Sequence, residues 1–340
     1  MINVRARRIL MSMIAALAFY KSPAFADDVA SFYKGRNVDM VIGYGAGGGF
    51  DMWARAVSRH MGRKVPGVPT MVSRNMPAAG SLVAANYLYH VAAKDGSVIG
   101  LIGRGVMFEP LFDGAGAKFD PLRFTFIGNP SKDSYMCALW HTHASQTAVD
   151  FYKNEMSLGS TGSGSESHVF PIVLANLLGM KAKVISGYKG SNEILLAIER
   201  RELDGLCLGT ETVRRTQQYA NGKYKILMQI GSKPDPILGN LPMISEFAES
   251  ADDRAVLELI FARIDVGRPF VGPPNVPKDR ANALRSAFMQ TMQDPEFKND
   301  VGRMGLEIDA SSGEELEALL RKAYQSDPEI VRRTAEMLKQ

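Results

Sequence analysis

An apolar run, a glycine-rich turn and an amphipathic stretch follow one another without interruption in residues 38–61, VDMVIGYGAGGGFDMWARAVSRHM. The apolar run stops at Gly43, and the turn then contains four more glycines, at Gly45, Gly47, Gly48 and Gly49. Interpreted as strand, turn and helix, the spacing Gly43-x-Gly45-x-x-Gly48 matches the dinucleotide-binding fingerprint. The pattern predicts an α/β fold and raises the question of what the turn holds.

The alternation of strand and helix continues along the chain and starts again after residue 154. Short glycine turns between such elements predict parallel sheets covered by helices. Right-handed crossovers then place the strand-to-helix turns at one sheet edge, where ligands bind. The predicted strands are 38–44, 69–76, 96–103, 155–161, 181–188, 203–210 and 224–231, and the predicted helices are 50–61, 81–92, 162–179 and 192–202.

Two long extended stretches, 124–143 and 257–277, predict connections between two α/β units. We therefore expect a hinged molecule with two lobes. Lobe 1 would contain residues 27–132 plus 263–340, and lobe 2 residues 133–262. Near the end of the chain, Ser312–Glu315 forms a capping box that predicts a further helix.

The first 26 residues have the pattern of a secretory signal peptide. Basic residues precede an apolar core of residues 9–20, and Ala24-Phe25-Ala26 forms an A-x-A cleavage pattern. The core is too short to span a bilayer, which needs roughly 20 apolar residues. We expect cleavage after Ala26 and a periplasmic protein that begins at Asp27.

The charge of the chain is concentrated in this leader. The whole sequence has 40 basic and 36 acidic residues, and the leader holds four basic residues (Arg5, Arg7, Arg8 and Lys21) and no acidic one. The mature chain is therefore formally neutral. No basic run remains, so we expect no nucleic-acid partner. An anionic ligand would have to be held by local groups.

The cysteines and histidines predict neither a metal site nor a cofactor. Cys137 and Cys207 have no metal-binding spacing and lie in apolar, strand-like runs, which favours two buried thiols. A disulfide stays open if their strands are neighbours, because an exported protein can form one. His141 and His143 face one side of an extended segment but have no third ligand nearby.

The glycine turn can hold an anion with its backbone N–H groups, either a pyrophosphate or a carboxylate. An exported protein rarely meets intracellular NAD, and the second strand ends in SRNMPAAG without the acidic residue of an NAD site. A second anion-binding turn, GSTGSGSESH, starts the other unit, which favours a carboxylate clamped between lobes. The alternatives are an exported NADP-dependent oxidoreductase using Arg74 and an exported esterase, although the esterase motif G-x-S-x-G is absent.

Several segments in order resemble one family. They are FYKGRNVDMVIGYGAGGGFDMWAR, VSRNMPAAGSLVAANYLY, SLGSTGSGSESH, GYKGSNEILLAIERRELDG and GPPNVPKDRANALRSAF. Over residues 32–335 the chain resembles the substrate-binding receptors of tripartite tricarboxylate transporters, the Bug-type extracytoplasmic solute-binding proteins. The resemblance implies an α/β fold of the type II periplasmic binding protein class, with two lobes joined by two extended crossover strands.

The resemblance also implies a function without catalysis or a cofactor. The protein would be a monomeric receptor that captures a small organic acid and delivers it to the membrane subunits of a tripartite tricarboxylate-type transporter. Two departures from the family pattern leave the choice of acid open. Phe50 replaces a common hydroxyl residue, and the turn at Gly209–Glu211 differs from the usual one.

The predicted ligand-binding residues come from both lobes. Position-by-position comparison with the family implies Tyr44, Gly45, Ala46, Gly47, Gly48, Gly49, Phe50, Asp51, Pro77, Ala78, Ala79, Gly80 and Ser81 in lobe 1. In lobe 2 it implies Ser160, Thr161, Gly162, Ser163, Gly164, Ser165, His168, Tyr188, Lys189, Gly190 and Ser191. Arg104, which follows the third strand, lies at the sheet edge that can reach the cleft.

Some of these residues have a second interpretation. Asp51 suits the start of a helix and can serve a local role. Lys189 can neutralise a carboxylate or simply lie exposed, and His168 is better suited to hydrogen bonding within a helix turn than to catalysis. We expect Gly48 to need a positive φ, so that Gly48→Val abolishes binding.

Overall fold

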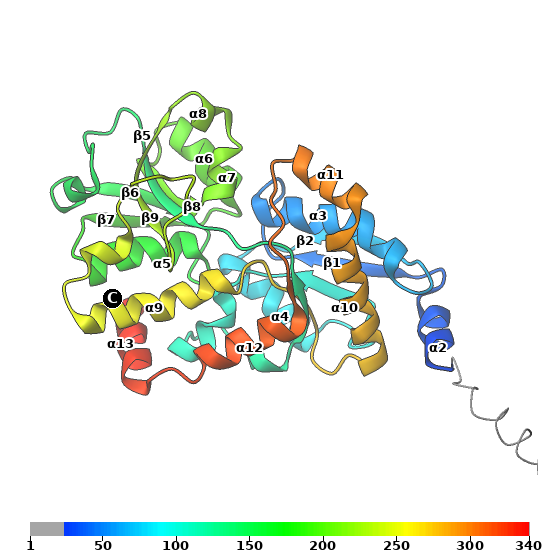
Figure 1. The fold of residues 1–340 in the computed structure, drawn as a ribbon. Helices are drawn as coiled ribbons and strands as arrows, with labels where there is room; N and C mark the ends of the chain where they lie inside the picture. Colours follow the sequence, from blue (N-terminus) through cyan, green and yellow to red (C-terminus); the bar gives the residue numbers. More distant parts are fainter. Residues whose placement is uncertain (1–23, 340) are drawn as a thin grey trace, which may run out of the picture.

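The computed structural model describes residues 24–339 and contains two β-sheets, each flanked by helices (Figure 1). The predicted signal peptide, 1–26, falls outside these residues except for its last three, which open helix α2 (Ala24–Tyr33). No helix within residues 24–339 is long and apolar enough to cross a membrane. We call the parts of the chain built on the two sheets the first and second lobes.

The first lobe has a mixed sheet of six strands in the order β11-β4-β10-β3-β1-β2. Strand β1 pairs in parallel with β2 and β3, and β10 is antiparallel between β3 and β4. The strands are β1 Asn37–Ile42, β2 Thr70–Asn75, β3 Val98–Leu101, β4 Thr125–Asn129, β10 Phe270–Gly272 and β11 Ser311–Ser312. The helices are α3 Gly49–Met61, α4 Leu82–His90, α10 Lys278–Gln293, α11 Pro295–Arg303 and α12 Gly313–Ala323.

Both faces of this sheet are buried, which explains the apolar run that precedes the glycine turn. Met40 and Ile42 pack into a cluster with α3 and α10, whereas Val41 packs into a cluster with α4 and α12. Because successive side chains of a strand point to opposite faces, a strand covered on both sides needs apolar residues at every position.

The second lobe has a sheet of five strands in the order β7-β6-β8-β5-β9. Strand β6 is parallel to β7 and β8, and β5 is antiparallel to both β8 and β9. The strands are β5 Tyr135–Trp140, β6 Met156–Ser160, β7 Ala182–Ser186, β8 Gly205–Gly209 and β9 Tyr224–Ile230. The helices are α5 Glu166–Ile172, which continues as the π-helix Val173–Leu177, α6 Ser191–Glu199, α7 Thr210–Arg214 and α8 Gln217–Ala220.

Two connections link the sheets, and the second differs from the prediction. The chain leaves the first sheet after β4 and enters the second at β5, as expected. On the way back, the predicted extended stretch 257–277 is helical in its first part, because α9 spans Ala251–Asp265. A capping box at Ser250 starts this helix. The predicted capping box at Ser312 is confirmed and starts α12.

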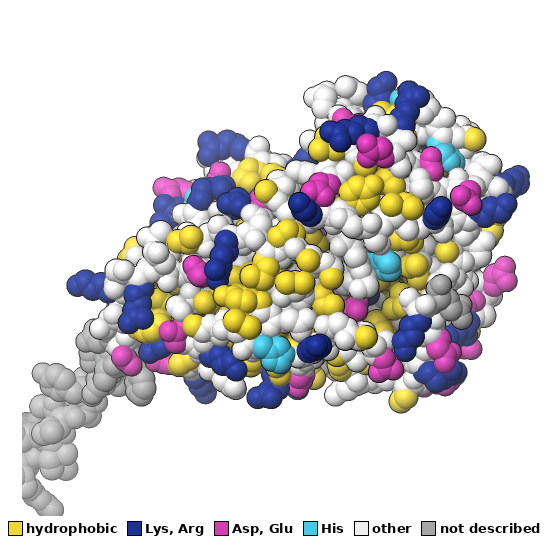
Figure 2. Space-filling model, turned by 180° about the vertical axis from the view of Figure 1, so that it is seen from behind, with side chains coloured by type: hydrophobic (Ala, Val, Ile, Leu, Met, Phe, Trp, Pro, Cys, Tyr) yellow, Lys and Arg dark blue, Asp and Glu magenta, His cyan; other side chains and the backbone are white. Residues whose placement is uncertain are grey.

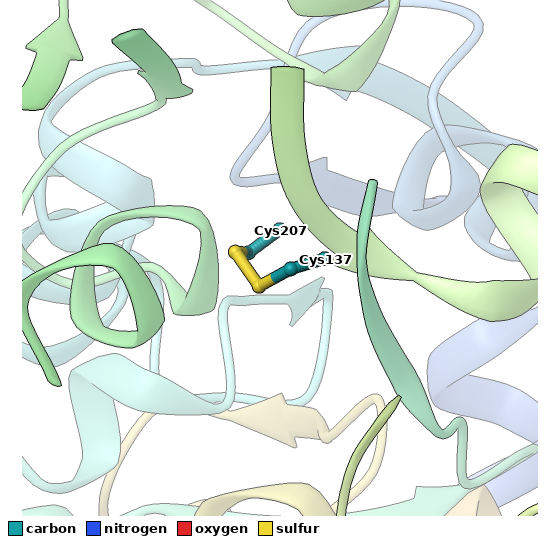
Figure 3. The surroundings of a disulfide bond; sticks show 2 residues. All are labelled: Cys137 and Cys207. Atoms are coloured by element: carbon teal, nitrogen blue, oxygen red, sulfur yellow. A yellow bond between two sulfur atoms is a disulfide. The ribbon is translucent and has the colours of Figure 1, made fainter. Parts of the chain in front are cut away.

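Cys137 and Cys207 form a disulfide (Figure 3), so the preference for two thiols was wrong. The two residues lie directly opposite each other in the antiparallel pair β5 and β8. The spacing along the chain gave no sign of this register, because the pairing of strands depends on the sheet topology. The bond lies within the second sheet, in the core that also contains α5.

Helices α9 and α13 (Pro328–Lys339) lie side by side (Figure 1) and each contributes to the cores of both lobes. Leu257 and Met337 belong to the core of the second lobe, whereas Leu259 and Ala335 belong to a core of the first. The predicted lobe boundaries stay a prediction. On the face shown in Figure 2, basic side chains are interspersed with acidic ones.

Candidate ligand-binding site

A small cavity lies between the lobes, where the strands of both sheets end. Its volume is about 60 Å³. Because a water molecule needs at least about 10–15 Å³ of such space, the cavity holds about four waters. The lobes therefore stand in a closed arrangement. Eight predicted residues line the cavity: Tyr44, Gly48, Gly49, Phe50, Arg104, Thr161, Ser165 and Ser191.

Eight further lining residues were missed: Asp133, Tyr135, Glu166, Ser167, Leu208, Gly209, Thr212 and Arg268. Glu166 and Ser167 directly follow the predicted turn of the second lobe, so extending that turn by two residues would have included them. Asp133 and Arg268 lie in the two connections between the lobes. A signal for them was present, since each is a charged residue within a largely uncharged, extended stretch.

The other predicted turns form contacts between the lobes instead of lining the cavity. The Gly80 N–H donates to the Thr161 carbonyl at 2.8 Å. A Cβ on Gly162 would lie 2.8 Å from the Gly80 nitrogen, and a Cβ on Gly80 would lie 2.8 Å from the Ser165 nitrogen. The residues of this interface outside the cavity lining are Pro77, Ala78, Ala79, Gly80 and Ser81 with Ser160, Gly162, Ser163 and Gly164.

A second contact between the lobes uses the glycine turn itself. The Gly45 N–H donates to the Lys189 carbonyl at 2.9 Å, and Asn192 Nδ2 donates to the Ala46 carbonyl at 3.4 Å. Lys189 is exposed and lies outside the lining, as do Tyr188 and Gly190. Lys189 therefore contributes its backbone to closure.

Asp51 is buried and fixes the shape of the glycine turn. Its carboxylate accepts hydrogen bonds from the Gly47 N–H at 2.8 Å, Asn75 Nδ2 at 2.7 Å and Arg55 Nε at 2.9 Å. Burial alone would raise the pKa of Asp51, but these hydrogen bonds outweigh it and hold the pKa below its usual value. Of its two interpretations, the structure shows the local one.

The conformation expected of Gly48 is found at its neighbour. Gly47 has a φ of +80°, whereas Gly48 has a φ of −75°. Gly48 is the N-cap of α3 and has no side chain to satisfy the first amides of the helix. The close approach to the ligand cavity was predicted correctly, because Gly48 and Gly49 line it, but the expected positive φ at Gly48 was wrong.

Arg104 carries the most unusual charge at the cavity. It is fully buried, and none of its three guanidinium nitrogens has a hydrogen-bond partner within residues 24–339. The guanidinium lies 5.6 Å from the centre of the Phe50 ring and 5.3 Å from that of Tyr135, at cation–π distance. Burial raises the pKa of Tyr135, so its phenol stays neutral.

The other charges near the cavity have partners. Arg263 Nε lies 3.5 Å from Glu166 Oε1. Arg268 donates to Asp133 and Glu211 at 3.0 Å each, and it thereby joins the two connections to α7 of the second lobe. Burial raises the pKa of Glu211, although the charge of Arg268 opposes this effect.

The remaining candidates show no metal chemistry. His168 is half-buried, with Nδ1 3.2 Å from Ser160 Oγ and 3.4 Å from Ser186 Oγ, and burial lowers its pKa. This is the expected hydrogen-bonding role. Among the described residues, no three His, Cys, Asp or Glu side chains are grouped to hold a metal, and His141 and His143 are not part of such a group.

Comparisons with known proteins agree with this architecture. A family model described as tripartite tricarboxylate transporter family receptor matches residues 53–335. The periplasmic binding protein BugD is similar with a TM-score of 0.72 and 24% identity, over 90% of this chain and 98% of its own. MatC from Rhodopseudomonas palustris, solved with malate, gives 0.70 and 18% over 89% and 99%. A second R. palustris protein, solved with adipate, gives 0.68 and 18% over 89% and 98%. No curated protein matches the sequence.

Proposed function

Because the chain belongs to the tripartite tricarboxylate transporter family of receptors, we propose that it is a periplasmic protein that holds a small carboxylate between its lobes. Its predicted type II periplasmic binding fold and its solute-binding role are confirmed by the family match and the solved structures. Delivery to the membrane subunits of a tripartite tricarboxylate-type transporter follows from the family. We further propose a monomer whose leader is cleaved after Ala26.

The carboxylate ligand rests mainly on one observation. The cavity between the lobes is bordered by a buried guanidinium, Arg104, that has no hydrogen-bond partner within residues 24–339. A buried charge without a partner is costly, and an anion that enters the cavity relieves that cost. The start of α3 at Gly48 and Gly49 adds backbone N–H groups and the positive end of a helix dipole.

The enzyme alternatives gain no support from this geometry. A dinucleotide site would need the amides of the glycine turn for a pyrophosphate, but Gly45 donates its N–H to Lys189 of the other lobe and Gly47 donates to Asp51. Arg74, which an NADP site would need, pairs with Asp39 and contacts Tyr87 instead. The known relatives are solute-binding proteins.

A thermal-shift screen of the mature chain tests the proposed function. A ligand at about 100 times its dissociation constant should stabilise the folded state by about 2.7 kcal/mol. Acids with one, two and three carboxylates should be compared with their uncharged amides and with sugars. We expect only acids to raise the melting temperature. Stabilisation by amides or sugars, with none by any acid, would contradict the carboxylate proposal.

A further inference from the structure

We infer that the ligand is a short monocarboxylate, a single anion with a small uncharged body, whose carboxylate is held beside Arg104. This inference rests on the proposed function and narrows it. It follows from the number of buried charges around the cavity and from the size of the cavity. Neither quantity was available from the glycine turns, because backbone amides recognise a carboxylate without counting its charges.

The buried charges form two groups, and only one of them is balanced. In the first group, Arg268 pairs with Asp133 and Glu211, and the charge of Arg215 acts on the same two carboxylates. Two cations therefore face two anions. This group needs no further charge from a ligand.

The second group has one positive charge in excess. Arg104 and Arg263 are both fully buried, and no nitrogen of either guanidinium has a hydrogen-bond partner within residues 24–339. Glu166 is the carboxylate that lies with them, 3.5 Å from Arg263. One anion from outside would balance the group. A dianion would instead leave one negative charge in excess next to buried Glu166, at an electrostatic cost.

The size of the cavity points to the same class of ligand. About 60 Å³ corresponds to about four waters, or to a molecule of about four to six non-hydrogen atoms. Acetate, propionate and butyrate fall in this range, whereas most dicarboxylates exceed it. The remaining walls suit a small uncharged body, since they include Leu208 and the rings of Tyr44 and Phe50.

Binding measurements with defined acids test this inference on the full mature chain. Acetate, propionate, butyrate and lactate should be compared with malonate, succinate and malate at pH 7.5, with propionamide as the uncharged control. We expect the best monocarboxylate to bind at least about 10-fold more tightly than any dicarboxylate. Equal or tighter binding of a dicarboxylate would overturn the inference while the proposed function stands. If no carboxylate binds at all, both fail.

Two variants change the charge count in opposite directions. Arg104→Gln removes the excess charge and should weaken propionate binding by about 100-fold or more, whereas Arg104→Lys should recover part of it. Glu166→Gln adds one positive charge and should shift the preference toward succinate by about 10-fold. Arg123→Gln, at an exposed position, should leave both affinities unchanged.

Circular dichroism and melting curves must show that each variant is folded. If Arg104→Gln does not fold, the selectivity of Glu166→Gln decides. An unchanged preference between propionate and succinate in that variant would show that the charge count does not select the ligand, and the inference would be wrong.

Discussion

The glycine turn of the first lobe and the glycine–serine turn of the second occupy equivalent places, each after a parallel strand and before a helix. Their internal supports differ. In the first lobe a buried carboxylate, Asp51, receives the hydrogen bonds of the turn. In the second lobe hydroxyl groups do so. Ser160 Oγ accepts from the Gly162 N–H at 3.0 Å, and Ser165 Oγ donates to the Gly162 carbonyl at 2.8 Å.

This difference shows that similar sequence patterns have taken separate tasks. The charged support holds the first turn while Gly48 and Gly49 stay open to the cavity. The neutral support lets the second turn pack directly against the backbone of the other lobe at Gly80. The second lobe differs also in carrying the disulfide, so the two lobes should respond differently to reduction, to added side-chain volume and to pH.

Reduction of the disulfide should have the largest effect, and the effect should fall on the second lobe. Loss of a native disulfide costs about 2–5 kcal/mol of unfolding free energy. Denaturant unfolding with and without dithiothreitol measures this loss, and hydrogen exchange locates it. The double variant Cys137→Ala/Cys207→Ala should be insensitive to dithiothreitol. Equal loosening of both lobes would contradict the assignment of the bond to one of them.

Gly162→Ala should impair closure and weaken ligand binding by roughly 5- to 150-fold. The added Cβ would lie 2.8 Å from the backbone of Ala79 and Gly80 in the other lobe, and such overpacking costs about 1–3 kcal/mol. Gly187→Ala is a matched control, because Gly187 has a φ of +120°, close to the +122° of Gly162, but has no atom within 4 Å of an added Cβ. Isothermal titration should find near-normal affinity in the control.

The smallest effect is expected at Asp51 and should depend on pH. Since the folded-state pKa of Asp51 is lowered, its contribution is present above the unfolded value of about 3.9 and is lost as the pH falls through the folded value. Asp51→Asn should therefore cost about 1 kcal/mol at pH 7, and this difference from the unmodified protein should shrink below about pH 4. Ser165→Ala should show a difference that does not change with pH. Denaturant unfolding at several pH values measures both.

Local patterns in the sequence predicted the first lobe well. The strand expected at 38–44 is β1, Asn37–Ile42, and the helix expected at 50–61 is α3, Gly49–Met61. The prediction failed at α9 because Leu, Ile and Phe crowd residues 257–264 and suggest a strand. The recurrence of Val256, Leu257, Ile260 and Ile264 at helical spacing, behind the cap at Ser250, was the stronger signal.

The charged part of the site could not be read from local patterns. Arg268 meets Asp133 and Glu211 only because the two connections run side by side at the hinge and face α7. Arg104 was anticipated from its place after β3, but its lack of partners depends on how the lobes close around it. These properties arise from tertiary packing, for which strand and helix periodicity carries no information.

The two helices that share both cores affect how fast a ligand can enter. An opening motion that separates the cores has to withdraw Ala335 or Met337 of α13, and Leu257 or Leu259 of α9, from its cluster. Exposing one such large apolar side chain costs about 1.5–3 kcal/mol, which lowers the open population roughly 10- to 150-fold. The ligand-free receptor would then be open only briefly, and the observed association rate would be reduced by the same fraction. The helical strap thus makes ligand capture a kinetic property of the receptor as well as a matter of affinity.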